Sequence, residues 1–116
     1  MDKRLNTKVA KTIIAFLKEN SISDDCRIYY NGIAFDLSNE DSPVAVNGGD
    51  AIDPNDYLDY CNADTISMSF EGGLYAVLND HMGERWCCQG GFVLMLEKLG
   101  FYYEMGNAWN LSLYAI

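Results

Sequence analysis

The side chains best suited to nucleophilic or metal chemistry are four cysteines and one histidine: Cys26, Cys61, Cys87, Cys88 and His81. A zinc site needs ligands at characteristic spacings, and neither the 61-to-81 gap nor the adjacent cysteine pair provides one. A Cys–His catalytic pair would require His81 to lie beside a thiol such as Cys87, and nothing in the sequence brings them together. The alternative is reduced thiols that pack as small hydrophobes, with a redox role left open for Cys87-Cys88. We therefore expect no metal, no cofactor and no catalytic residue.

Acidic side chains are abundant enough for hydrolytic or calcium chemistry, but no single pair stands out. Asp50, Asp53, Asn55 and Asp56 resemble a calcium loop only superficially, because the glycine and the terminal glutamate of an EF-hand are missing. The run Asn-Gly-Gly-Asp at 47–50 lacks the Lys-Ser/Thr ending of a phosphate-binding loop. The sequence thus predicts neither a calcium site nor a nucleotide site.

Charge is distributed unevenly along the 116 residues, whose net charge is −9. Residues 1–27 hold six basic and four acidic side chains, whereas residues 28–84 hold eleven acidic side chains and no Lys or Arg. Residues 85–116 are balanced, with two of each sign. Such a chain should be repelled by nucleic acid phosphates and anionic membranes and attracted to a basic protein.

The candidate docking surface lies in the acidic stretch, where aspartates recur with tyrosines between them. Like charges at helical neighbour spacing repel one another, and no basic side chain nearby compensates them. Tyrosines anchor protein contacts and charge steers encounter, so this pattern is typical of a binding surface. A surface that serves solubility alone is the alternative. The predicted partner-binding residues are Asp50, Asp53, Asp56, Tyr57, Asp59, Tyr60 and Asp64.

The first half of the chain contains regular elements separated by turn-forming residues. An apolar stripe predicts an amphipathic helix over 6–19, and Asn31-Gly32 between apolar runs predicts a β-hairpin over 26–37. Residues 38–52 look irregular, with a short strand at 44–46. Asp53 and Pro54 indicate the start of a short helix over 54–61. Alternation over 65–70 predicts a half-buried strand with Ser67 and Ser69 pointing away from the core.

The second half predicts two helices and a final hairpin. The helices span 74–78 and 85–99, the second ending at Gly100. Residues 101–105 and 108–115 should pair around Gly106-Asn107, with Trp109 and Leu111 on one face of the last strand. The whole predicts one α+β domain over 1–116. Its antiparallel sheet would have about five strands, with two main helices and two short helices packed on it. An apolar fraction of 49% is sufficient for a packed core.

Two segments resemble small acidic proteins carried by phages and mobile elements of Gram-positive gut bacteria. They are Ser-Met-Ser-Phe-Glu-Gly-Gly-Leu-Tyr at 67–75, followed by Val-Leu-Asn at 77–79, and Tyr-Tyr-Glu-Met-Gly-Asn-Ala-Trp-Asn-Leu at 102–111. The resemblance implies an anti-defence factor of the anti-CRISPR kind, in which carboxylates take the place of DNA phosphates on a host nuclease.

These observations favour a non-enzymatic inhibitor of a nucleic-acid-handling defence enzyme. Its partner would be a basic nuclease or effector, and it would contact neither nucleic acid nor membrane directly. One alternative is an immunity-type protein that neutralises a basic toxin, and another is a small enzyme using a cysteine or a carboxylate pair. The N-terminus lacks the apolar stretch of a secretory signal, which predicts a cytoplasmic location, in the host cytosol if a phage encodes the protein.

Overall fold

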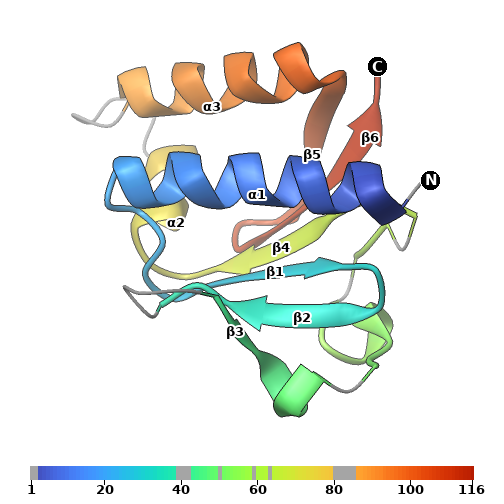
Figure 1. Cartoon of the computed structure of the whole chain (residues 1–116). Helices are drawn as coiled ribbons and strands as arrows, with labels where there is room; N and C mark the ends of the chain where they lie inside the picture. The colour runs from blue at the N-terminus through green and yellow to red at the C-terminus, as the bar shows by residue number, and fades with distance from the viewer. Residues whose placement is uncertain (1–2, 39–42, 50, 59, 63, 80–85) are drawn as a thin grey trace.

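A six-stranded antiparallel sheet organises the chain (Figure 1). The computed structural model describes residues 3–38, 43–49, 51–58, 60–62, 64–79 and 86–116. The strand order is β3-β2-β1-β4-β6-β5. The strands are β1 (Cys26–Tyr30), β2 (Ile33–Asp36), β3 (Val44–Ala45), β4 (Ser67–Phe70), β5 (Phe101–Asn107) and β6 (Asn110–Ala115). The α+β prediction is confirmed, with one strand more than the expected five.

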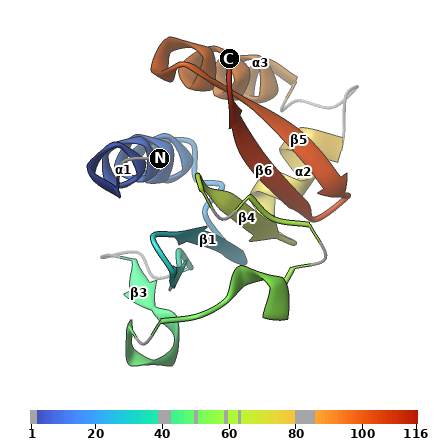
Figure 2. The ribbon, with the colours of Figure 1, turned by 90° about the vertical axis from the view of Figure 1, so that its right-hand side faces the viewer.

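Three α-helices pack on the inner face of the sheet: α1 (Lys3–Glu19), α2 (Gly73–Asn79) and α3 (Trp86–Leu99). The two long helices lie along this face beside each other, and α2 lies next to α3 and β4 (Figures 1 and 2). The buried positions of α1 are Asn6, Val9, Ala10, Ile13 and Leu17, which follow the helical period. The amphipathic pattern therefore fixed which side of α1 faces the sheet.

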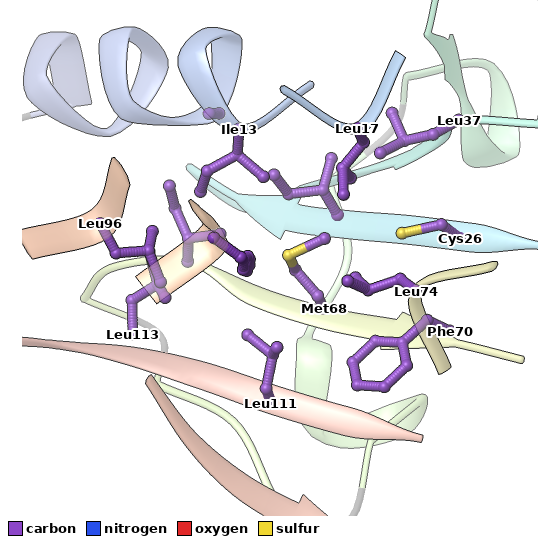
Figure 3. Packing of buried hydrophobic residues seen from close by; sticks show 14 of the residues in the cluster. Ile13, Leu17, Cys26, Leu37, Met68, Phe70, Leu74, Leu96, Leu111 and Leu113 are labelled. Atoms are coloured by element: carbon purple, nitrogen blue, oxygen red, sulfur yellow. The ribbon is translucent and has the colours of Figure 1, made fainter. Parts of the chain in front are cut away.

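The main core fills the space between the helices and the inner face (Figure 3). Ile13 and Leu17 of α1 share one cluster with Met68 of β4, Leu96 of α3 and Leu111 of β6, all of them essentially inaccessible to solvent. Cys26 and Ile28 of β1 belong to the same cluster. Alternate residues of β1 therefore face inward, and this alternation sends Arg27 and Tyr29 to the opposite, outer face.

The first hairpin forms as the sequence predicts. Asn31 and Gly32 both have positive φ, at 53° and 74°, and join β1 to β2 with Tyr30 opposite Ile33. Asn and Gly tolerate this backbone region better than other residues, which is why the turn is placed here. Gly100, with φ of 90°, follows the last residue of α3 as expected of a helix C-cap.

The final hairpin turns two residues later than predicted. Strand β5 continues to Asn107, with an irregular pairing between Met105 and Asn107, and the turn is Ala108-Trp109. The Asn107 side chain accepts a hydrogen bond from the Trp109 backbone N–H at 3.0 Å, and this local bond directs the chain back. The prediction that Trp109 shares one face of the last strand with Leu111 is therefore wrong. Trp109 packs on the outer face, in a cluster separate from the main core.

The outer face is covered by the connection between β2 and β4, which contains two short 3-10 helices, η1 (Val46–Gly49) and η2 (Pro54–Asp56). A second cluster forms there around Tyr29, Ala34 and Leu58, with Val46, Ile52, Cys61 and Trp109 at its edges. The predicted helix over 54–61 is reduced to η2, a single turn. Among the described residues of this segment, Leu58 is the buried one, and it packs in the second cluster.

Strand β4 is buried more fully than its alternation predicts. Ser67 is only 1% exposed, and its hydroxyl lies 2.9 Å from that of Ser112 and accepts from the Asn62 backbone N–H at 2.9 Å. These bonds satisfy a polar group that would otherwise be costly to bury. The covering connection therefore converts a strand expected to be half-buried into one enclosed on both faces.

Among the helices that the structure describes, none has the length and apolar character needed to cross a membrane.

Candidate functional site

The predicted partner-binding residues whose side chains the structure describes, Asp53, Tyr57, Tyr60 and Asp64, belong to the connection on the outer face but do not form one compact group. Tyr57 and Tyr60 are 40% and 59% exposed, and Asp53 and Asp64 are also exposed. The backbone of Asp56 belongs to η2, while its side chain lies outside the described part of the chain. Asp50 and Asp59 also lie outside the described residues. The prediction of a docking surface thus applies here to two tyrosines and two carboxylates.

Local hydrogen bonds fix the positions of Asp53 and Asp64. The Asp53 carboxylate accepts from both the backbone N–H and the side-chain amide of Asn55, each at 3.0 Å, and caps η2. The Asp64 carbonyl accepts from the Asn6 side chain at 3.1 Å, which places Asp64 near the start of α1. The Asp53 carboxylate is therefore held in the middle of the covering connection, and the Asp64 backbone is held near the end that enters β4.

The two tyrosines are also directed to different places. The Tyr57 ring lies 6.2 Å from that of Tyr29, centroid to centroid, above the sheet. Tyr60 rests against the backbone at Gly106 in β5, where an added Cβ would fall 2.6 Å from the Tyr60 Cβ. Only Tyr57 reaches the concave part of the outer face.

That concave part is a hollow of about 340 Å³ over β1, β2 and β4, which we call the sheet hollow. Its charged lining consists of Asp25, Asp36, Glu71 and Arg27, and its aromatic lining of Tyr29, Tyr57 and Trp109. Ser38 and Ser69 add hydroxyl groups. The hollow therefore combines a negative balance of charge with an aromatic wall.

Strand register explains why these side chains meet. Arg27 of β1 lies opposite Asp36 of β2 and opposite Ser69 of β4, so the three form a row across neighbouring strands. Side chains paired in this way project from the same face about 5 Å apart. The Glu71 backbone N–H donates to the Asp25 carbonyl at 3.0 Å, and this bond brings the two acidic residues together at one end of the row.

The aromatic wall is positioned by contacts from three directions. The Tyr29 hydroxyl lies 3.3 Å from the Ser69 hydroxyl, and Tyr57 stands against the Tyr29 ring. The Trp109 carbonyl accepts from the Phe70 backbone N–H at 2.8 Å, which fixes the β5–β6 turn against the end of β4. Elements distant in the sequence thus supply one wall.

No protein-family model, curated protein or solved structure matches this chain. What the site can do chemically is set by its own residues: carboxylates can hold a cation, and aromatic faces can stack on one.

Several residues of the sheet hollow were missed by sequence reasoning. Asp25 and Arg27 were counted with the basic N-terminal segment, and Trp109 was assigned to the core face. The alternation of β1 was a usable signal, because burial of Cys26 and Ile28 requires Arg27 to project outward. The pairing of β1 with β4, which adds Ser69 and Glu71, had no comparable signal.

The two thiols that the structure describes, those of Cys26 and Cys61, have environments that oppose nucleophilic chemistry. Burial raises the pKa of the Cys26 thiol far above its ordinary value, and the nearby Asp24 and Asp36 carboxylates raise it further. Burial also raises the pKa of Cys61, with a second contribution from Asp53. A reactive cysteine requires the opposite shift.

The remaining candidates for catalysis or metal binding are His81, Cys87 and Cys88, and the structure describes them only in part. His81 lies outside the described residues, as do the side chains of Cys87 and Cys88. Within the described part of the chain, no three His, Cys, Asp or Glu side chains are arranged to hold a metal ion.

Cys26 leads to an expected dependence of stability on alkaline pH. Its folded-state pKa is raised above the ordinary value of 9.0, so the stability from its neutral form is complete below about pH 9 and is lost as pH rises. Above that pH, the slope of unfolding free energy should be steeper than in Cys26→Ala by up to about 1.4 kcal/mol per pH unit. Urea titrations of both proteins at several pH values measure the difference. Equal slopes above pH 9 would show that the thiol is not buried as described.

Proposed function

We propose that the chain is a small protein-binding inhibitor that docks on a basic, nucleic-acid-handling partner. The docking surface is the outer face, formed by the connection that carries Asp53, Tyr57, Tyr60 and Asp64, together with the sheet hollow. The single observation that carries the proposal is the exposure of two tyrosines, Tyr57 and Tyr60, and two carboxylates, Asp53 and Asp64, along the one connection that covers the outer face.

Separation of charge between the two sides of the sheet supports this orientation. Lys3, Lys8 and Lys11 are exposed on α1, which covers the inner face, whereas Asp53 lies on the connection across the outer face. A basic partner approaching the outer face meets carboxylates first, while α1 would repel it. Charge arranged in this way steers encounter and fixes orientation.

The exposed aromatic side chains add contact area to the electrostatic attraction and so also support docking. Tyrosine contributes large contact area at low entropic cost and is enriched among residues that dominate binding energy. Tyr57 and Tyr60 are held by Tyr29 and by the Gly106 backbone, so little mobility is lost when a partner covers them.

The inhibitory role is taken from the resemblance to anti-defence proteins. A nuclease or effector that binds nucleic acid has a basic groove, and a protein presenting carboxylates can compete for it. An immunity-type protein that neutralises a basic toxin would use the same surface. The two roles differ in the partner that is captured, a host defence enzyme or a toxin.

The test combines affinity capture with charge-neutral variants. Immobilised protein should retain a partner that elutes as salt rises from about 0.05 to 0.5 M, and nucleic acid should displace it. The double variant Asp53→Asn/Asp64→Asn should weaken binding roughly tenfold, because it removes two surface charges while asparagine still caps η2.

Its matched control is Glu19→Gln/Glu97→Gln, which removes the same net charge from exposed positions on α1 and α3. The control should bind as the parent does. Retention that is insensitive to salt, or equal loss in both double variants, would rule out docking through the outer face.

A further inference from the structure

We infer that the sheet hollow is a receptor for a guanidinium group, so that the partner contributes an arginine side chain to it. The assignment of that arginine to a protein partner rests on the proposed function, whereas the chemistry of the hollow rests on its own lining.

The charge of the lining selects a cation. Three carboxylates, Asp25, Asp36 and Glu71, share the hollow with one basic side chain, Arg27, among the residues that line it. Arg27 and Asp36 are direct neighbours across the β1–β2 ladder, so Arg27 belongs to the same group of charges. One basic side chain against three carboxylates leaves the hollow with a net negative charge, which attracts a positive group from outside. An anion such as phosphate would be repelled by the same balance.

Hydrogen bonds fix the backbone of Asp25 and Glu71 and the carboxylate of Asp36 around the hollow. Asp25 and Glu71 are joined by their 3.0 Å backbone bond, and the Asp25 N–H donates to the Ser38 hydroxyl at 3.1 Å. Asp36 in turn accepts from the Ser38 backbone N–H at 2.8 Å. A planar group with several N–H donors can contact more than one of these acceptors at once.

The aromatic wall distinguishes a guanidinium from other cations. Tyr29, Tyr57 and Trp109 line the hollow together. Tyr29 is buried beneath Tyr57, so the accessible ring surface is that of Tyr57, which is exposed, and Trp109, which is partly buried. Arginine stacks its plane on aromatic faces and is only weakly hydrated, whereas the compact lysine ammonium keeps its water more strongly. A metal ion is coordinated by oxygen, nitrogen or sulfur atoms, so the aromatic rings would not contribute to binding it. The combination of ring faces and carboxylates therefore favours arginine.

The size of the hollow is consistent with such a ligand. The volume of the hollow, about 340 Å³, lies at the lower end of the range for small-molecule pockets. A hollow of this size can accommodate a single side chain. The exposed connection contributes Tyr57 to the lining of the hollow. A partner docked on that connection can therefore extend an arginine into the hollow.

The test uses blocked amino acids as probes, followed by nuclear magnetic resonance of the intact chain. N-acetyl-arginine amide should produce saturable shifts at the Trp109 indole and at the backbone amides of Arg27, Ser69 and Glu71. A dissociation constant on the order of 1 mM is expected for so small a ligand. N-acetyl-citrulline amide, which has the same shape without the charge, should bind at least about tenfold more weakly, and N-acetyl-lysine amide should also bind more weakly.

Variants connect the binding to the lining. Glu71→Gln and Tyr57→Leu should each weaken arginine binding roughly tenfold, while the control Glu19→Gln, at an exposed position on α1, should leave it unchanged. Glu71 and Tyr57 are exposed enough for both variants to fold, which thermal melts verify. Equal binding of citrulline or lysine, shifts outside the hollow, or binding that survives Glu71→Gln would each overturn the inference.

The results also separate this inference from the proposed function. Salt-sensitive partner binding that is unaffected by Glu71→Gln, in a chain that does not bind the arginine probe, would refute the receptor and leave the docking proposal intact. Binding of the arginine probe by a chain that retains no basic partner would refute the docking proposal alone.

Discussion

Phe92→Ala should lower the free energy of unfolding by about 3–5 kcal/mol, the largest single-residue effect that we expect in this chain. Phe92 is fully buried in α3 and lies between two other rings, 5.8 Å from Phe16 of α1 and 5.7 Å from Tyr103 of β5. Its removal leaves a cavity where two helices and the sheet meet, and neither neighbour can collapse into it without losing its own contacts. Small domains are stable by only about 5–15 kcal/mol in total, so the variant should be partly unfolded at moderate temperature.

Denaturant titration monitored by circular dichroism measures this loss. Leu94→Ala is the matched control, because Leu94 lies in the same helix and is 57% exposed. The control should change stability by no more than about 0.5 kcal/mol. Similar losses in the two variants would mean that α3 does not present Phe92 to the core.

Gly72→Ala should destabilise the fold by about 1–3 kcal/mol through steric conflict with backbone. An added Cβ would fall on the carbonyl oxygen of Asp24 and within 2.8 Å of its side-chain Cγ. Asp24 cannot easily move away, because its carboxylate accepts a hydrogen bond from the Gly73 backbone N–H at 3.0 Å. To make room for the added methyl group, the α1–β1 connection must move away from the start of α2, and the hydrogen bond between Asp24 and Gly73 is weakened.

The contrasting substitution is Gly90→Ala in α3, where an added Cβ would meet no atom within 4 Å. Alanine in a helix interior loses less entropy on folding than glycine, so this variant should gain about 0.5–1 kcal/mol. Thermal melts of both variants give the comparison. If Gly72→Ala left stability unchanged, the α1–β1 connection would not be in contact with the segment between β4 and α2.

Local patterns predicted the elements because the forces that form them act over a few residues. The period of Val9, Ile13 and Leu17 identified the buried side of α1, and Asn31-Gly32 identified the first turn. The sequence did not reveal that the helix beginning at Pro54 would end after one turn, at Asp56, or that Leu58 would join a second cluster on the outer face. The turn at Ala108-Trp109 was displaced by a single side-chain bond from Asn107, which propensity alone did not indicate.

The candidate site could be predicted only in part for a similar reason. Tyr57 was singled out from its acidic surroundings, and it does line the sheet hollow. Asp25 and Glu71 are separated by 46 positions in the chain and meet through a backbone bond that forms only when β1 pairs with β4. Averaging charge along the chain placed Arg27 in a basic segment, whereas register places it opposite Asp36.

The sequence by itself determined the α+β composition, the inward face of α1, the first hairpin and the concentration of acidic residues in the middle of the chain. The tertiary structure decided which acidic residues share a surface with an arginine and three aromatic rings. The physical reason is the sequence separation of the residues that interact. Helical period and turn chemistry are encoded by neighbouring residues, whereas the sheet hollow arises from strand pairings that join residues far apart in the chain, which no local window contains.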